Sequence, residues 1–97
     1  MARWTEDGWE LLETIALNAA LFTGFESSAH KVMEDALRAC TLIESNPGIG
    51  KKILNIYNEK RYWHPFHEGK VLVWKLDSNG NPVFTGAFYS LPEYLTT

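Results

Sequence analysis

The segment best suited to chemistry by residue type is Pro-Gly-Ile-Gly-Lys-Lys, residues 47–52. In a helix–hairpin–helix module, two such glycines expose backbone N–H groups to a phosphate, and the lysines that follow add positive charge. One interpretation is therefore a nucleic-acid contact made by Gly48, Gly50, Lys51 and Lys52. The other interpretation is a helix boundary, in which Asn46 caps a new helix and Pro47 takes its first position, where a missing N–H costs nothing.

The surroundings of this segment favour the boundary. Asn46 stands where an apolar residue normally anchors the hairpin of such a module, and the chain has a net charge of −3. A nucleotide-binding P-loop is excluded, because that motif needs glycine at position 45 and Ser or Thr at position 52, where this chain has Ser45 and Lys52. DNA binding therefore stays the alternative function.

A second candidate is Arg-Tyr-Trp-His-Pro-Phe-His-Glu-Gly, residues 61–69. Its aromatic residues surround a proline and follow neither a helical nor an alternating period, which predicts a compact loop. Such a loop either folds over the core or binds a partner, since exposed aromatic residues on loops are typical of recognition. The predicted partner-binding residues are Tyr62, Trp63, His64, Pro65, Phe66 and His67.

Residues for catalysis or metal binding do not gather in the sequence. A zinc site needs three or four convergent ligands, and His64 and His67 have no Cys or third His close by. No serine lies in a Gly-x-Ser-x-Gly turn, and the histidines have no obvious carboxylate partner by spacing. We therefore expect no enzyme, no metal and no other cofactor.

Size and charge describe an ordinary globular chain. Its 97 residues predict one domain, residues 1–97, with 45% apolar and 22% charged residues. Residues 1–44 carry three Lys or Arg against eight acids, whereas residues 45–70 carry five against two. An acidic front with a modest basic middle is not typical of a nucleic-acid binder. The four tryptophans fit either a core or a protein–protein interface.

The sequence also predicts a compartment. The one cysteine, Cys40, lies on an apolar helical stripe and is expected to be a buried thiol in a reducing compartment. The first residues carry acids where the apolar run of a secretory signal should begin. The longest apolar tract, residues 14–25, is interrupted by Asn18 and is too short to span a bilayer. These features predict a cytoplasmic protein.

Two amphipathic helices should open the chain. Asp7 and Glu10 form a capping box for the first helix, and Gly24 is suited to end it. Its apolar face is expected to comprise Trp9, Leu12, Ile15, Ala16, Ala19 and Phe22. Ser27 or Ser28 should cap the second helix. Its expected stripe is Ala29, Val32, Met33, Ala36, Leu37, Cys40 and Ile43, and the residues expected to face water are Lys31, Glu34, Asp35 and Arg38.

A third helix and a β-hairpin should complete the fold. Helical spacing after Pro47 predicts a helix that ends near His64, because the residue before proline avoids the helical region. From Lys70 onward, two β-rich runs surround an Asn-Gly turn, which is the strongest short-range hairpin signal. Residues 90–95 suggest a last helical turn with Ser90 as its cap. The expected class is α+β, with a helical hairpin and a third helix followed by a C-terminal β-hairpin.

Two strands alone are marginally stable in water, so the hairpin must pack on the helices or on another chain. With enzymes set aside, the residues favour an adaptor or inhibitor that occupies the surface of another protein. In length, helical front, His-Pro-Phe-His-Glu-Gly-Lys segment and C-terminal hairpin, the chain resembles the small anti-RecBCD proteins of lambdoid phages. The resemblance implies binding to the RecC subunit of the host helicase–nuclease, which favours phage recombination.

The same resemblance implies an association with a host peptidyl-prolyl isomerase. Pro65, flanked by His64 and Phe66, is then the proline expected in the isomerase pocket. A different phage-type inhibitor, such as a blocker of a defence nuclease, is a further alternative.

Overall fold

The computed structural model describes residues 2–54 and 59–91, which form two helices and one five-stranded sheet. The elements in chain order are β1 (Arg3–Trp4), α1 (Glu6–Thr23), α2 (Glu26–Ser45), the 3₁₀ turn η1 (Pro47–Ile49), β2 (Lys51–Leu54), β3 (Lys60–His67), β4 (Lys70–Leu76) and β5 (Pro82–Phe88). The strand order is β1-β5-β4-β3-β2, with β1 parallel to β5 and the other pairs antiparallel. The prediction of three helices followed by a hairpin is therefore wrong.

The two helices form the antiparallel hairpin that their periodicity predicted, although their caps differ. Thr5, not Asp7, caps α1 by accepting a hydrogen bond from the Gly8 N–H at 3.0 Å. Gly24 ends α1 as predicted, with φ of 79°. Helix α2 begins one residue before the predicted serines and has Phe25 at its N-cap position, without a side-chain cap. The predicted serine cap of α2 is therefore not formed.

The predicted third helix is only the turn η1, followed by an extended chain. The helical spacing of the isoleucines at 49 and 53 is overridden because the β2 backbone pairs with β3, as in Lys51 opposite Trp63 and Lys52 opposite Tyr62. Residues 55–58, where the expected helix would continue, lie outside the described residues. A short apolar run does not distinguish a helix from a strand. Here the edge of β3 offers hydrogen-bond partners, so the segment forms strand β2 instead of a helix.

The predicted aromatic loop is a strand. Residues of β3 alternate between the two faces of the sheet, so Tyr62 stacks on Trp74 at a centroid distance of 6.1 Å while Trp63 contacts the opposite face. The register shifts between Pro65 and His67. Proline has no N–H for the ladder, and such a β-bulge is one of the few places where a strand tolerates it.

The C-terminal hairpin forms as predicted, with β4 and β5 joined through Asn79-Gly80 and Gly80 at φ of 81°. The Asp77 carboxylate accepts hydrogen bonds from the N–H groups of Asn79 and Asn81, each at 2.9 Å. The last helical turn expected for residues 90–95 falls mainly on residues 92–97, outside the described chain.

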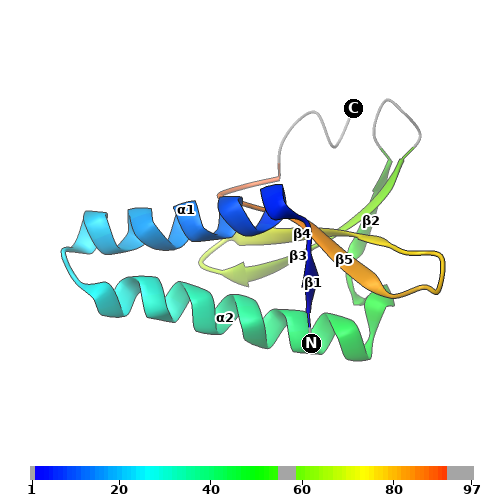
Figure 1. Ribbon diagram of the computed structural model, residues 1–97, viewed down its shortest axis with the longest axis horizontal. Helices are drawn as coiled ribbons and strands as arrows, with labels where there is room; N and C mark the ends of the chain where they lie inside the picture. The colour runs from blue at the N-terminus through cyan, green and yellow to red at the C-terminus, as the bar shows by residue number, and fades with distance from the viewer. Residues whose placement is uncertain (1, 55–58, 92–97) are drawn as a thin grey trace.

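The core lies between the helices and one face of the sheet. Helix α1 packs on β5 and α2 packs on β3, and Trp74 and Phe84 are fully buried beneath them. Cys40 is buried, as predicted. Figure 1 shows that the connection between the two helices extends to the left, well beyond the strands. Among the described residues, no helix is long and apolar enough to cross a membrane.

Candidate functional site: a groove beside an apolar helical tip

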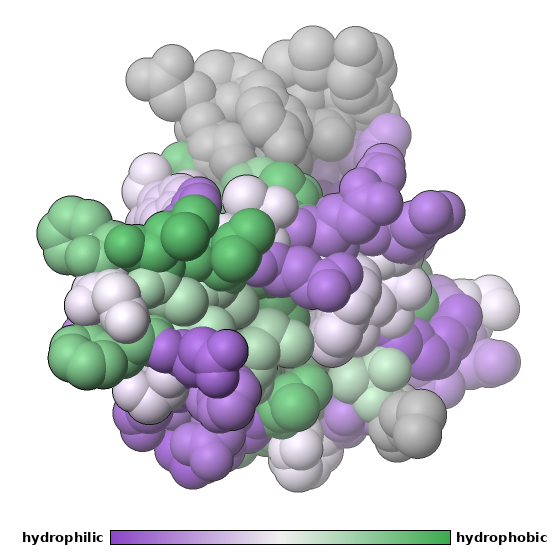
Figure 2. Space-filling model, turned by 60° about the vertical axis from the view of Figure 1, so that its left-hand side comes forward, coloured by the Kyte–Doolittle hydropathy of each residue, from purple (hydrophilic) through white to green (hydrophobic). Residues whose placement is uncertain are grey.

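Four large apolar side chains are exposed where the helices extend beyond the sheet, and we call them the hairpin tip. Their exposed fractions are 58% for Leu17, 71% for Leu21, 93% for Phe22 and 68% for Phe25. Figure 2 shows hydrophobic surface gathered at this end of the helices, beside a hydrophilic region. The expectation that Phe22 belongs to the buried face of α1 is wrong, because the last turns of α1 project past the strands that would cover it.

A groove of about 810 Å³ opens next to the tip. Its walls come from the end of α1, the start of α2, the β3–β4 turn and the residue after β5, which are far apart in sequence. Residues that line it include Asn18, Phe22, Lys31, His67, Lys70 and Tyr89. Its volume lies within the range of about 300–1,000 Å³ that is common for ligand pockets. The groove combines apolar and charged side chains in one concave surface.

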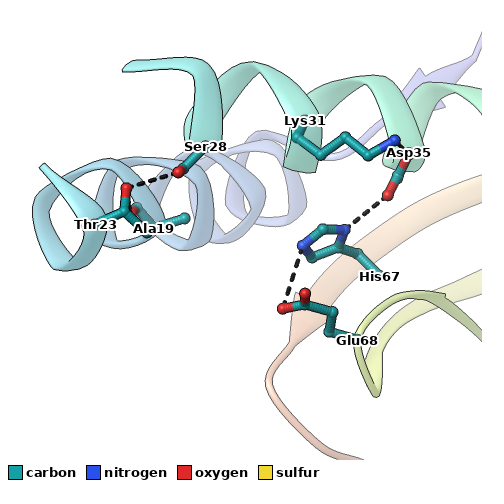
Figure 3. Close-up of polar contacts among 7 residues, drawn as sticks. All are labelled: Ala19, Thr23, Ser28, Lys31, Asp35, His67 and Glu68. Carbon is teal, nitrogen blue, oxygen red and sulfur yellow. Dashed lines mark hydrogen bonds and ion pairs between the residues drawn. The ribbon is translucent and has the colours of Figure 1, made fainter. Parts of the chain in front are cut away.

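His67 connects the turn after β3 to helix α2. Its Nδ1–H donates a hydrogen bond to Asp35 Oδ2 at 2.7 Å, as Figure 3 shows. Lys31 Nζ and Arg38 Nη1 lie 3.3 and 3.5 Å from the other oxygen of Asp35. The hydrogen bond from His67, followed by the hydrogen bond and charge of Lys31, lowers the pKa of Asp35, although partial burial opposes this shift.

This contact was not predicted from the sequence. Asp35 was expected to face water and the histidines to lack a carboxylate partner, yet Asp35 and His67 meet across 32 positions of the chain. No local spacing reveals such a pair, because it depends on how α2 lies on β3. The hairpin tip, in contrast, does have a sequence signal, because Leu17 and Leu21 are apolar residues of α1 outside its predicted buried face.

The β3–β4 turn holds Glu68 in an uncommon conformation. Its φ of 43° lies in the left-handed region, and the next residue, Gly69, has φ of 81°. Turns of this kind favour Asn or Gly at both central positions, so a glutamate here is under strain. The carboxylate of Glu68 lies 3.6 Å from Nε2 of His67, beyond ordinary hydrogen-bond length.

Tyr89 forms the opposite side of the groove. Its hydroxyl accepts a hydrogen bond from Asn18 Nδ2 at 3.0 Å, which fixes the ring against α1. Lys70 Nζ lies 5.8 Å from the centroid of the Tyr89 ring, within the range of a cation–π contact. The hydroxyls of Thr23 and Ser28 hydrogen-bond to each other at 2.6 Å at the groove's helical end (Figure 3).

The six predicted partner-binding residues do not form one exposed loop. Tyr62 and Phe66 pack against the core beneath the helices, whereas Trp63 contacts the other face of the sheet. Pro65 is exposed, and the ring Nδ1 of the partly buried His64 lies 2.6 Å from the Pro65 carbonyl oxygen. Of the six, only His67 reaches the groove.

The predicted phosphate-binding segment has a different structural explanation. A Cβ built on Gly50 would lie 2.5 Å from Trp74 Cζ2, so this glycine permits close packing against an indole. Lys51 and Lys52 are neighbours on a strand and therefore point to opposite faces, and Lys51 Nζ lies 5.5 Å from the Trp63 ring. The second helix of a helix–hairpin–helix module is replaced by β2, which removes the basis for that alternative.

The described residues show neither a metal cluster nor an activated cysteine. Within residues 2–54 and 59–91, no group of three or more His, Cys, Asp or Glu side chains is placed to hold a metal ion. Burial raises the pKa of the Cys40 thiol to about 12, and the negative charge of Glu44 acts in the same direction. A thiol with such a pKa is not an activated nucleophile.

Comparison with protein-family models, with curated proteins and with solved structures found no match to this chain. The features of the described surface that bear on function are therefore the groove and the hairpin tip.

Proposed function

We propose that this chain is a non-catalytic protein-binding module that docks on a larger protein through its hairpin tip. The observation that carries the proposal is the exposure of Leu17, Leu21, Phe22 and Phe25 on two adjacent helix ends. Single exposed apolar residues are common, but a cluster rimmed by polar groups is typical of an interaction site. Aromatic anchors such as Phe22 supply much of the binding energy when they enter a partner's pocket.

The chemistry of the candidate nucleophiles supports action without catalysis. The Cys40 thiol is buried and has a raised pKa, and the Ser28 hydroxyl is hydrogen-bonded to Thr23. The imidazole of His67 donates to Asp35, and its other nitrogen faces Glu68 rather than a hydroxyl. A nucleophile activated by histidine needs the two groups within hydrogen-bond reach.

The partner we propose is the RecC subunit of a bacterial RecBCD helicase–nuclease, with modulation of RecBCD favouring phage recombination. The support is the resemblance in length, helical front and His-Pro-Phe-His-Glu-Gly-Lys segment to anti-RecBCD proteins of lambdoid phages. We also propose that a host peptidyl-prolyl isomerase binds at Pro65, which is exposed on β3. We also propose the host cytoplasm as its compartment, because both proposed partners and a reduced Cys40 would be found there.

The test uses purified RecBCD immobilised on a sensor surface and the full chain in solution. The double variant Leu21→Ser with Phe25→Ser should weaken binding at least tenfold, since each change removes an apolar anchor. The matched control is Leu37→Ser, because Leu37 is a leucine with 48% exposure elsewhere on the helical layer. Circular dichroism must show that all variants keep their helices.

Two results would count against the proposal. Absence of binding by the unaltered chain would reject RecBCD as the partner. Binding that is unchanged in the double variant, or weakened equally by Leu37→Ser, would reject the hairpin tip as the docking surface. A separate titration with the isomerase and a Pro65→Ala variant tests the second partner.

A further inference from the structure

We propose that the groove beside the hairpin tip binds an acidic segment of a partner protein, one in which an apolar side chain stands next to a carboxylate. This inference rests on the proposed function and names the chemistry that the groove selects. The carboxylate would lie against the ammonium group of Lys70, and the apolar side chain would pack on Phe22. Three features of the groove carry the proposal.

The first feature is charge. In a chain whose net charge is −3, this groove is lined by Lys31 and Lys70 against the single carboxylate of Glu68. Lys31 is engaged by Asp35, whereas Lys70 makes no ion pair among the described residues and its ammonium group lies over the Tyr89 ring. A cation without an ion-pair partner in a concave site attracts an acidic ligand, because the surrounding protein reduces screening by water.

The second feature is the mixed lining. Phe22 is almost fully exposed at the edge of the groove, and Tyr89 is held in place by Asn18. An anion alone would gain nothing from this aromatic wall. A peptide that combines an apolar side chain with a carboxylate satisfies both the wall and the lysine, as in recognition sites that pair an apolar pocket with a few placed polar groups.

The third feature is the weak contact made by Glu68, the one carboxylate in the lining of the groove. Its carboxylate faces His67 Nε2 at 3.6 Å, while Nδ1 of the same ring is bound to Asp35, as Figure 3 shows. The side chain is 78% exposed and its backbone has φ of 43°. At 3.6 Å this carboxylate lies beyond hydrogen-bond length, so it can turn into solvent and leave Lys70 to a ligand carboxylate.

The test is a titration of the isotope-labelled full chain, followed by NMR, with the capped tripeptide acetyl-Glu-Phe-Glu-amide. Two matched peptides separate the contributions: Lys-Phe-Lys reverses the charge, and Glu-Ser-Glu removes the aromatic ring. We expect the first peptide to shift signals of Phe22, His67, Lys70 and Tyr89. We expect the charge-reversed peptide to leave them unchanged and Glu-Ser-Glu to bind several-fold more weakly.

Two charge variants of the chain should change the affinity for the acidic peptide in opposite directions. Lys70→Glu should abolish binding of the acidic peptide, whereas Glu68→Gln should strengthen it about threefold by removing the competing carboxylate. Lys75→Glu is the matched control, because Lys75 is an exposed lysine on β4 outside the groove, and it changes the net charge of the chain by the same amount as Lys70→Glu. The control variant should bind the acidic peptide with at most a twofold loss.

Several results would overturn the inference. Equal shifts with the acidic and basic peptides would show that charge is not selected. Equal loss in the Lys70 and Lys75 variants would indicate a general charge effect, and the same shifts with inorganic phosphate would indicate a site for small anions. Because no RecBCD is present in this titration, its failure is distinguishable from failure of the hairpin tip to bind RecBCD.

Discussion

Gly50 packs against the indole of Trp74, the largest fully buried side chain among the described residues. A Cβ on Gly50 would lie 2.5 Å from Trp74 Cζ2 and 2.9 Å from the carbonyl oxygen of Trp63. A rigid ring and a backbone atom would both have to move to make room. The glycine that first suggested a phosphate contact is therefore a packing position between η1 and the core.

Gly50→Ala should destabilise the chain by about 1–3 kcal/mol, which is the usual cost of overpacking a core. The matched control is Gly48→Ala, because the nearest atom to a Cβ there is Asn46 Oδ1 at 3.8 Å, an ordinary contact. Urea unfolding of both variants measures the difference. Equal free energies of unfolding would contradict the packing role of Gly50.

Glu68→Asn should raise the free energy of unfolding by about 1 kcal/mol, because asparagine adopts the left-handed conformation more readily than glutamate. Glu68→Gln is the control, since it removes the charge without easing φ of 43°. Thermal unfolding of the two variants separates strain from electrostatics. If Gln stabilises as much as Asn, the charge near His67 is responsible and not the backbone.

The contact between His67 and Asp35 should make stability depend on acid pH. Because the folded state lowers the pKa of Asp35, the contact stabilises the protein above the unfolded pKa of about 3.8. That stabilisation should be lost as the pH falls through the lower folded value. Unfolding in urea at pH 7 and at pH 2.5 should therefore show a smaller pH-dependent loss in His67→Gln than in the unaltered chain. An identical loss would show that His67 does not lower the Asp35 pKa.

The Cys40 thiol should resist modification in the folded chain. Its pKa is raised to about 12, so burial stabilises the protonated form, and this contribution is present below pH 9 and declines as the pH approaches 12. A chromogenic disulfide reagent at pH 8 should react with it only slowly until urea unfolds the protein. Rapid labelling of the folded state, at the rate seen in urea, would show that Cys40 is accessible.

Features encoded by neighbouring residues were predicted correctly. Gly24 ends α1 because glycine alone adopts a positive φ at no steric cost, and Asn79-Gly80 forms the β4–β5 turn for a similar reason. The helical period of residues 6–45 produced both helices and the burial of Cys40. Each of these features is indicated by residues within a few positions of one another in the chain.

Features that depend on distant partners were not predicted. The residues after Gly50 fit a helix by spacing, but β3 offers an edge with which they pair as β2. Strand β3 places Tyr62 and Phe66 against the core beneath the helices and Trp63 against the other face of the sheet, so aromatic residues occupy both faces and the period of a strand is hidden. Phe22 fits the buried face of α1 by spacing, yet α1 extends beyond the sheet that would cover it.

By itself the sequence determined where the two helices form, where α1 turns back and where the final hairpin bends, because these choices depend on local sterics and periodicity. Only the tertiary structure decided that β2 and β3 join the sheet, that His67 meets Asp35 and that the hairpin tip and its groove face solvent. Those outcomes depend on contacts between segments that are far apart in the chain, where strand edges pair and side chains pack. Local sequence does not indicate which distant segments will meet.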